Sequence, residues 1–144
     1  MTNPIQTAQD RFADGFNCSQ SVFSAYASQL GIDDETALKL ASPFGGGVAH
    51  QGNVCGAVTG ALMALGLGHG NATLENKEDT YHLADEFIKR FQERHGTILC
   101  CELIGYDLRA PAESQAAREQ GVFKTVCPGL VKDAAELVAE FLDK

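Results

Sequence analysis

The chain has 144 residues, of which 44% are hydrophobic, so its length predicts a single domain, residues 1–144, that can bury a core without covalent cross-links. Its formal net charge is −8, from 11 basic and 19 acidic residues. This balance argues against nucleic-acid binding, which needs clustered lysine and arginine, and against contact with an anionic membrane. Because the first ten residues are polar and carry no apolar signal segment, we expect a cytoplasmic protein.

Hydrophobic residues at helical spacing predict three helices in the first third of the chain. Each is bounded by capping residues at its start and by glycine or proline at its end. The glycine run that follows opposes helix and strand alike, so we expect a loop there. The predicted helices cover 5–14, 18–30 and 34–42, and the loop covers 44–48.

The run from Val54 to Leu67 is apolar on all sides, which predicts a helix buried in the middle of the domain; it is too short to insert into a membrane. Gly56, Gly60 and Ala64 stand four apart and would let another helix approach closely. Further helices are predicted over 75–94, 98–104, 111–118 and 128–142, the first with a buried seam of Tyr81, Ala84, Ile88 and Phe91. We therefore expect an all-α fold, a compact bundle of five to seven helices around a central apolar Gly/Ala-rich helix.

Five cysteines lie far apart in the sequence, yet each falls where a helix is predicted to begin. The free N–H groups and the positive dipole at a helix start favour a thiolate over a thiol. An odd number of cysteines in a reducing compartment also fits poorly with a framework of structural disulfides. If the helix starts converge, the chain builds a thiolate cluster from Cys18, Cys55, Cys100 or Cys101, and Cys127.

Residues 52–60, Gly-Asn-Val-Cys-Gly-Ala-Val-Thr-Gly, contain the pattern Gly-x-x-Cys-Gly-Ala-x-x-Gly. With Cys18 upstream and Cys101 and Cys127 downstream, the chain resembles the family of redox-active proteins named for its C_GCAxxG_C_C pattern, from about Phe16 to the C-terminus. The resemblance implies a small helical domain with four cysteines and a redox role, but no particular reaction. Cys100 departs from the pattern and leaves open which of the adjacent pair belongs to the site. The simpler expectation is that Cys100 only packs.

Two chemistries fit this cluster. In thiol–disulfide exchange with a redox partner, Cys55 would be the reactive thiolate in its helix's first turn, one of the other cysteines would resolve the disulfide, and no cofactor would be required. In the alternative, an electron-transfer module, the same sulfurs would bind zinc or an iron–sulfur cluster. The residues assigned to either chemistry are Cys18, Cys55, Cys101 and Cys127. A third hypothesis is a helical interaction domain whose cysteines are core residues.

Glycines and one histidine complete the candidate site. Gly52, Gly56 and Gly60 of the motif are assigned to cofactor binding, with Gly56 leaving room beside Cys55 for a sulfur, a metal or a substrate. The loop of residues 45–47 lacks the Gly-Lys-Ser/Thr ending of a phosphate-binding loop, so we interpret it as a lid or as close packing near Cys55. His50 is a candidate ligand or proton donor.

Overall fold

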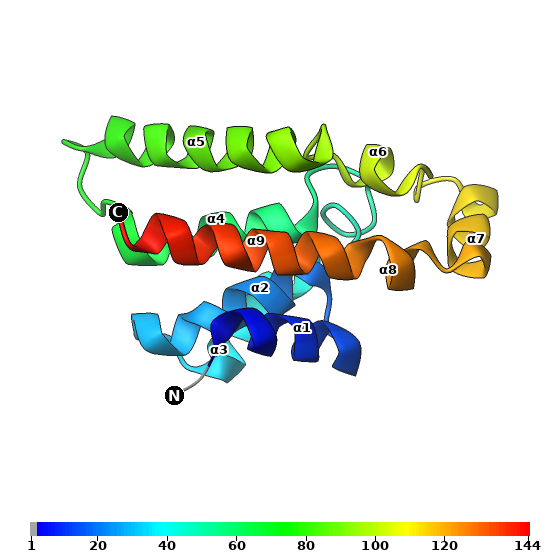
Figure 1. Cartoon of the computed structure of the whole chain (residues 1–144), viewed down its shortest axis with the longest axis horizontal. Coiled ribbons are helices and arrows are strands. Elements are labelled where there is room, and N and C mark those ends of the chain that lie inside the picture. The colour runs from blue at the N-terminus through cyan, green and yellow to red at the C-terminus, as the bar shows by residue number, and fades with distance from the viewer. Residues whose placement is uncertain (1–2) are drawn as a thin grey trace.

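The computed structural model describes residues 3–144, and it confirms the all-α prediction (Figure 1). In this part of the chain the only extended pairing is one isolated antiparallel bridge, between Val54 and Leu99. No helix within it is both long and apolar enough to cross a membrane. The helices are α1 (Pro4–Asp14), α2 (Cys18–Ala27), α3 (Asp34–Ala41), α4 (Gly56–His69), α5 (Lys77–His95), α6 (Cys100–Ile104), α7 (Pro111–Gln120), α8 (Val122–Thr125) and α9 (Cys127–Leu142), with 3₁₀ turns at Ser28–Leu30 and Ser42–Phe44.

The start of α2 is set by a reciprocal pair of hydrogen bonds. The side chain of Asn17 accepts from the amide of Gln20 at 2.8 Å, and the side chain of Gln20 accepts from the amide of Asn17 at 3.1 Å. These bonds satisfy two N–H groups that a helix start leaves free. Asn17 also donates to the carbonyl of Ser42 at 3.1 Å, which ties this cap to the 3₁₀ turn just before the glycine-rich loop. Cys18 is therefore held as the first residue of its helix.

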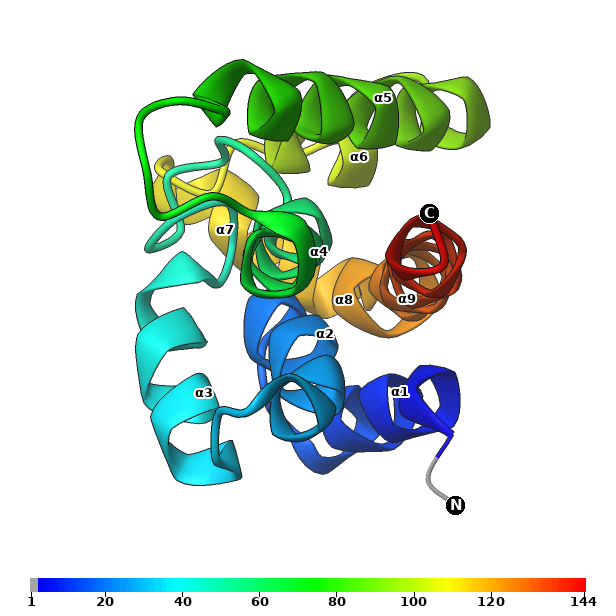
Figure 2. The same cartoon turned by 90° about the vertical axis from the view of Figure 1, so that its left-hand side faces the viewer.

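The apolar helix α4 lies between α2, α5 and α9 (Figure 2). Its contact with α2 depends on two glycines. A Cβ atom at Gly60 would lie 2.5 Å from the carbonyl oxygen of Ser19, and one at Gly56 would lie 2.9 Å from the Ser19 amide nitrogen. Thr59 adds a hydrogen bond of 3.1 Å to the buried Ser19 hydroxyl. Because glycine has no side chain, the backbones of α2 and α4 can lie in direct contact.

Helices α5 and α9 complete the core. Phe87 of α5 meets Phe141 of α9 edge to face, with ring centroids 5.7 Å apart, and Phe91 is also fully buried. The predicted seam of α5 was wrong at Tyr81, whose side chain is 65% exposed. Because Phe87 and Phe91 define the buried face of α5, the spacing of a 3.6-residue helix turns Tyr81 away from it.

We predict that Gly60→Ala lowers the free energy of unfolding by about 1–3 kcal/mol, because its methyl group would push the backbones of α2 and α4 apart. Gly66→Ala is the matched control on the same helix, since a Cβ there has no neighbour within 4 Å. That change should instead raise the free energy by about 0.5–1 kcal/mol through helix propensity. Urea unfolding followed by circular dichroism measures both, and equal effects would contradict the close contact.

Candidate functional site

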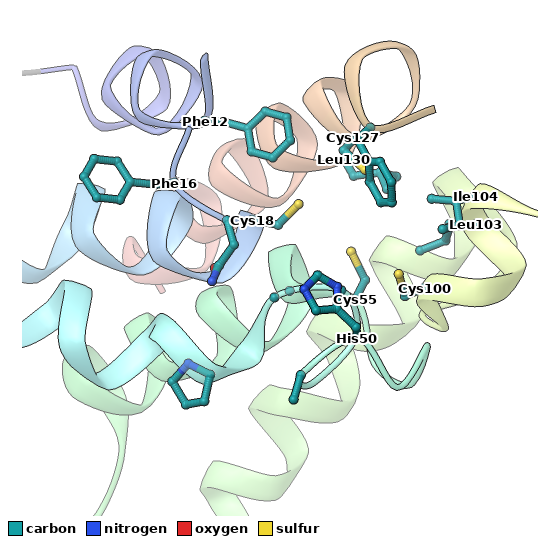
Figure 3. A pocket seen from close by; sticks show the side chains of 18 of the residues that line it. Phe12, Phe16, Cys18, His50, Cys55, Cys100, Leu103, Ile104, Cys127 and Leu130 are labelled. Atoms are coloured by element: carbon teal, nitrogen blue, oxygen red, sulfur yellow. The ribbon is translucent and has the colours of Figure 1, made fainter. Parts of the chain in front are cut away.

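One end of the bundle contains a cavity of about 480 Å³ that four cysteines line, namely Cys18, Cys55, Cys100 and Cys127 (Figure 3). Each of them stands at the beginning of a helix, as the first residue of α2, α6 or α9 or as the residue that precedes α4. All are free thiols. The rest of the wall is mainly apolar and includes Phe12, Phe16, Leu103, Ile104, Phe123 and Leu130. No aspartate, glutamate, lysine or arginine contributes to it.

A short antiparallel pairing brings Cys55 and Cys100 together. Around the Val54–Leu99 bridge, the amide of Cys55 donates to the carbonyl of Ile98 at 2.7 Å, and the amide of Cys100 donates to the carbonyl of Asn53 at 2.7 Å. Side chains alternate between the two faces of such a pairing. Cys55 and Cys100 each follow a bridged residue, so they are diagonal neighbours on the same face.

Cys101 lies on the other side of the α6 start. Its amide donates to the carbonyl of Gly52 at 3.2 Å, and its Cβ lies 3.1 Å from where a Cβ of Gly52 would stand. It does not line the cavity, whereas Cys100 does. The structure therefore places Cys100 where the sequence motif suggested Cys101. The reason is the register of the bridge, because a shift of one residue exchanges the two faces.

Cys18 and Cys127 influence each other's ionisation. The Cys18 thiol donates to the sulfur of Cys127, and this bond lowers the pKa of Cys127 below its ordinary value because it stabilises the thiolate. The same bond raises the pKa of Cys18 well above its ordinary value, and burial and the neighbouring sulfur of Cys55 act in the same direction. Of the two thiols, Cys127 is therefore the one that ionises more readily.

The pKa values of the other two thiols, Cys55 and Cys100, are both raised. Burial raises the pKa of Cys55 to about 11, although the amides of Ala57 and Val58 at the start of α4 work against it. Burial also raises the pKa of Cys100 to about 12, with a further contribution from the sulfurs of Cys55 and Cys127. The sequence analysis expected the helix start to lower the pKa of Cys55. Because Cys55 is only 3% exposed, the cost of desolvating its thiolate outweighs the stabilisation that the helix start gives to that thiolate.

The glycine-rich loop forms a left-handed turn over the cavity. Five consecutive residues, 46–50, have positive φ, including φ 65° at Val48, 50° at Ala49 and 62° at His50. This conformation costs roughly 1–2 kcal/mol for each residue that has a side chain. Bonds from Gly52 to Gly46 (3.1 Å) and from Asn53 to Gly47 (2.9 Å) hold it in place.

The turn brings Gly47 and His50 to the site. A Cβ at Gly47 would lie 2.7 Å from the Cβ of Cys100 and 2.6 Å from the amide nitrogen of Asn53, so only glycine fits against α6. The ring of His50 lines the cavity, as Figure 3 shows. We expected this loop to pack closely beside Cys55, and in the structure its close contacts are with Cys100 and Asn53.

The glycines assigned to cofactor binding have different surroundings. Gly56 lines the cavity, Gly52 packs on Cys101, and Gly60 packs on Ser19. Of the four sulfurs assigned to the alternative metal site, the structure brings those of Cys18, Cys55 and Cys127 to the cavity and leaves that of Cys101 outside it. Within residues 3–144, no three side chains of the types Cys, His, Asp and Glu are placed to hold a metal ion together. Cys101 faces away from the set, and the other sulfurs line the cavity wall.

Fold and site together define an all-helical protein with a buried cluster of thiols. Residues 16–141 match the family model described as "Putative redox-active protein (C_GCAxxG_C_C)", and the chain therefore belongs to this family. The match covers every cysteine of the cavity. No curated protein and no solved structure matches the chain.

We predict that Cys18→Ala shifts the pKa of Cys127 upward, because the variant has no thiol to donate to the Cys127 sulfur. Brief alkylation with iodoacetamide across a pH series, with the Cys127 peptide quantified by mass spectrometry, gives this pKa. The pH profile should move to higher pH in Cys18→Ala and stay in place in the control Cys101→Ala, which changes a thiol outside the cavity. An unmoved profile in Cys18→Ala would refute the hydrogen-bonded pair.

A second prediction concerns Gly47. Gly47→Ala and Gly121→Ala both place a methyl group at a residue with φ 70°, but only the methyl group at Gly47 would meet other atoms. Both changes should cost about 1 kcal/mol of stability through backbone strain, and Gly47→Ala should cost about 1–3 kcal/mol more. Only Gly47→Ala should also alter the alkylation rate of Cys100. Equal losses of stability would show that the loop does not press on α6.

Proposed function

We propose that this protein is a thiol–disulfide redox protein in which Cys127 is the attacking thiolate and Cys18 the resolving thiol. The observation that carries the proposal is that Cys18 and Cys127 line the same cavity, where their interaction lowers the pKa of Cys127 and raises that of Cys18. Exchange requires one ionised sulfur and a second sulfur within reach of it. The proposal moves the reactive role from Cys55, whose burial favours the neutral thiol, to Cys127.

The reaction that this pair supports is the reduction of a disulfide. The Cys127 thiolate attacks one sulfur of the substrate, the substrate S–S bond breaks, and one thiolate leaves. The Cys18 sulfur then attacks Cys127 in the mixed disulfide, and the Cys18 proton passes to one of the two thiolates released. The substrate gains two electrons and becomes one thiol and one thiolate, which takes a proton from water, while the protein gains a Cys18–Cys127 disulfide. A dithiol reductant would return the electrons to the protein.

Cys55 and Cys100 keep their protons in this scheme. Their pKa values, about 11 and about 12, hold both thiols neutral beside the Cys127 thiolate. A second negative charge in the same cavity would repel the first one strongly, because few polar groups screen it there. The neutral neighbours thus restrict the negative charge to one sulfur.

The alternative proposal, a zinc or iron–sulfur centre, would require the cavity sulfurs to move toward a common point. Elemental analysis and a visible spectrum of protein prepared without oxygen distinguish it from thiol exchange. Stoichiometric metal bound by these cysteines would replace the redox-pair proposal.

We predict that mild oxidation of the wild-type protein with hydroxyethyl disulfide yields a Cys18–Cys127 disulfide, identified by mass spectrometry after digestion. Cys18→Ser should stop at a mixed disulfide on Cys127, because no resolving sulfur remains. Cys127→Ser should lose the reaction, and the control Cys101→Ser should behave as the wild type. The same count of free thiols after oxidation and after reduction would rule out the proposed exchange.

A further inference from the structure

A second hollow, of about 460 Å³, adjoins the cysteine cavity, since His50 and Phe123 line both. Its other lining residues are Leu108, Ser114 and Arg118. Leu108 comes from the turn before α7, and Ser114 and Arg118 come from one face of α7. The two hollows differ in their charge, because no aspartate, glutamate, lysine or arginine lines the cysteine cavity, whereas the second hollow contains the guanidinium group of Arg118.

Arg118 is available for a ligand. Its guanidinium donates to the Ser114 hydroxyl, one turn earlier on α7, at 3.0 Å. Within residues 3–144 it is the one arginine without a carboxylate partner, since Arg11, Arg90, Arg94 and Arg109 all form ion pairs. The nearby Glu119 accepts a bond from Gln115, and Glu113 accepts from the Asp107 amide. In a chain with a net charge of −8, a free guanidinium beside a hollow is a specific attraction for an anion.

We propose that the substrate of this site is a low-molecular-weight disulfide that carries a carboxylate, with the carboxylate at Arg118 and Ser114 and the S–S bond at Cys127. This inference rests on the proposed function and names its substrate class. Guanidinium and hydroxyl groups together match the two oxygens of a carboxylate. An apolar arm that passes His50 and Phe123 would connect the two hollows.

The burial of the sulfurs supports a small substrate. Cys55, Cys100 and Cys127 are only 3%, 8% and 6% exposed, and Cys127 lies inside the cavity rather than on an outer surface. A disulfide within a folded protein would have to leave its own surroundings to reach such a thiolate. A short flexible molecule can enter a cavity of about 480 Å³.

The test compares two small disulfides, the dianion dithiodipropionate and the neutral hydroxyethyl disulfide. The rate constant for loss of protein thiols should fall about fivefold with the dianion in Arg118→Gln, the effect of one partly exposed charge pair. The rate with the neutral disulfide should not change, which separates binding of the carboxylate from any effect on Cys127. In the control Arg109→Gln, which removes a guanidinium paired with Asp107, both rates should match the wild type.

A redox-inert probe separates this inference from the proposed function. Octanedioate has the length and charges of dithiodipropionate with methylene groups in place of sulfur, and its binding can be followed by NMR titration. Binding to the wild type that weakens in Arg118→Gln supports the carboxylate site even if neither disulfide oxidises the protein, in which case the proposed exchange fails alone. The inference would be overturned if Arg118→Gln changed the rate with neither disulfide and octanedioate did not bind to the wild type.

Discussion

The antiparallel pairing of residues 52–55 with residues 98–101 is the constraint on which the rest of the site depends. Its backbone hydrogen bonds place the starts of α4 and α6 side by side and fix which side chain of each segment faces the cavity. Cys55 and Cys100 are neighbours for this reason, although 45 positions separate them in the sequence. The same segment anchors the left-handed turn, because Asn53 donates to the carbonyl of Gly47. A change in this register would alter the cavity wall and the loop together.

The electrostatics of the cavity follow from its mainly apolar wall and from the burial of its sulfurs. Four thiols share an apolar space, and burial penalises the ionised form of each. Of these four, Cys127 is the one whose pKa is lowered, because Cys18 interacts with its sulfur, and the pKa of Cys18 is raised in turn. Cys55 and Cys100 remain neutral because they lack such an interaction and lie near sulfur. In the proposed exchange, the reactivity of Cys127 therefore comes from its interaction with Cys18 more than from helix dipoles.

Close backbone contacts serve the same site from two directions. Gly56 and Gly60 let α4 approach α2 and so bring Cys55 toward Cys18. Gly47 lets the strained turn of residues 46–50 approach α6 and so closes the cavity beside Cys100. Strain of this kind persists only where the surrounding structure holds it, and such places are frequently functional. The turn also carries His50, which stands between the cysteine cavity and the hollow of Arg118.

The sequence by itself determined the helices other than the short α8, the cap of α2 at Asn17 and the location of every cysteine at or next to a helix start, because capping and periodicity act over a few residues. It also predicted the glycine-rich loop and its closeness to the motif. Only the tertiary structure decided that Cys100 faces the cavity and that the lowered pKa belongs to Cys127. The first depends on the register between two distant segments, and the second on burial and on a contact between helices α2 and α9. Neither quantity has a local signature, since both arise from residues that meet only in the folded chain.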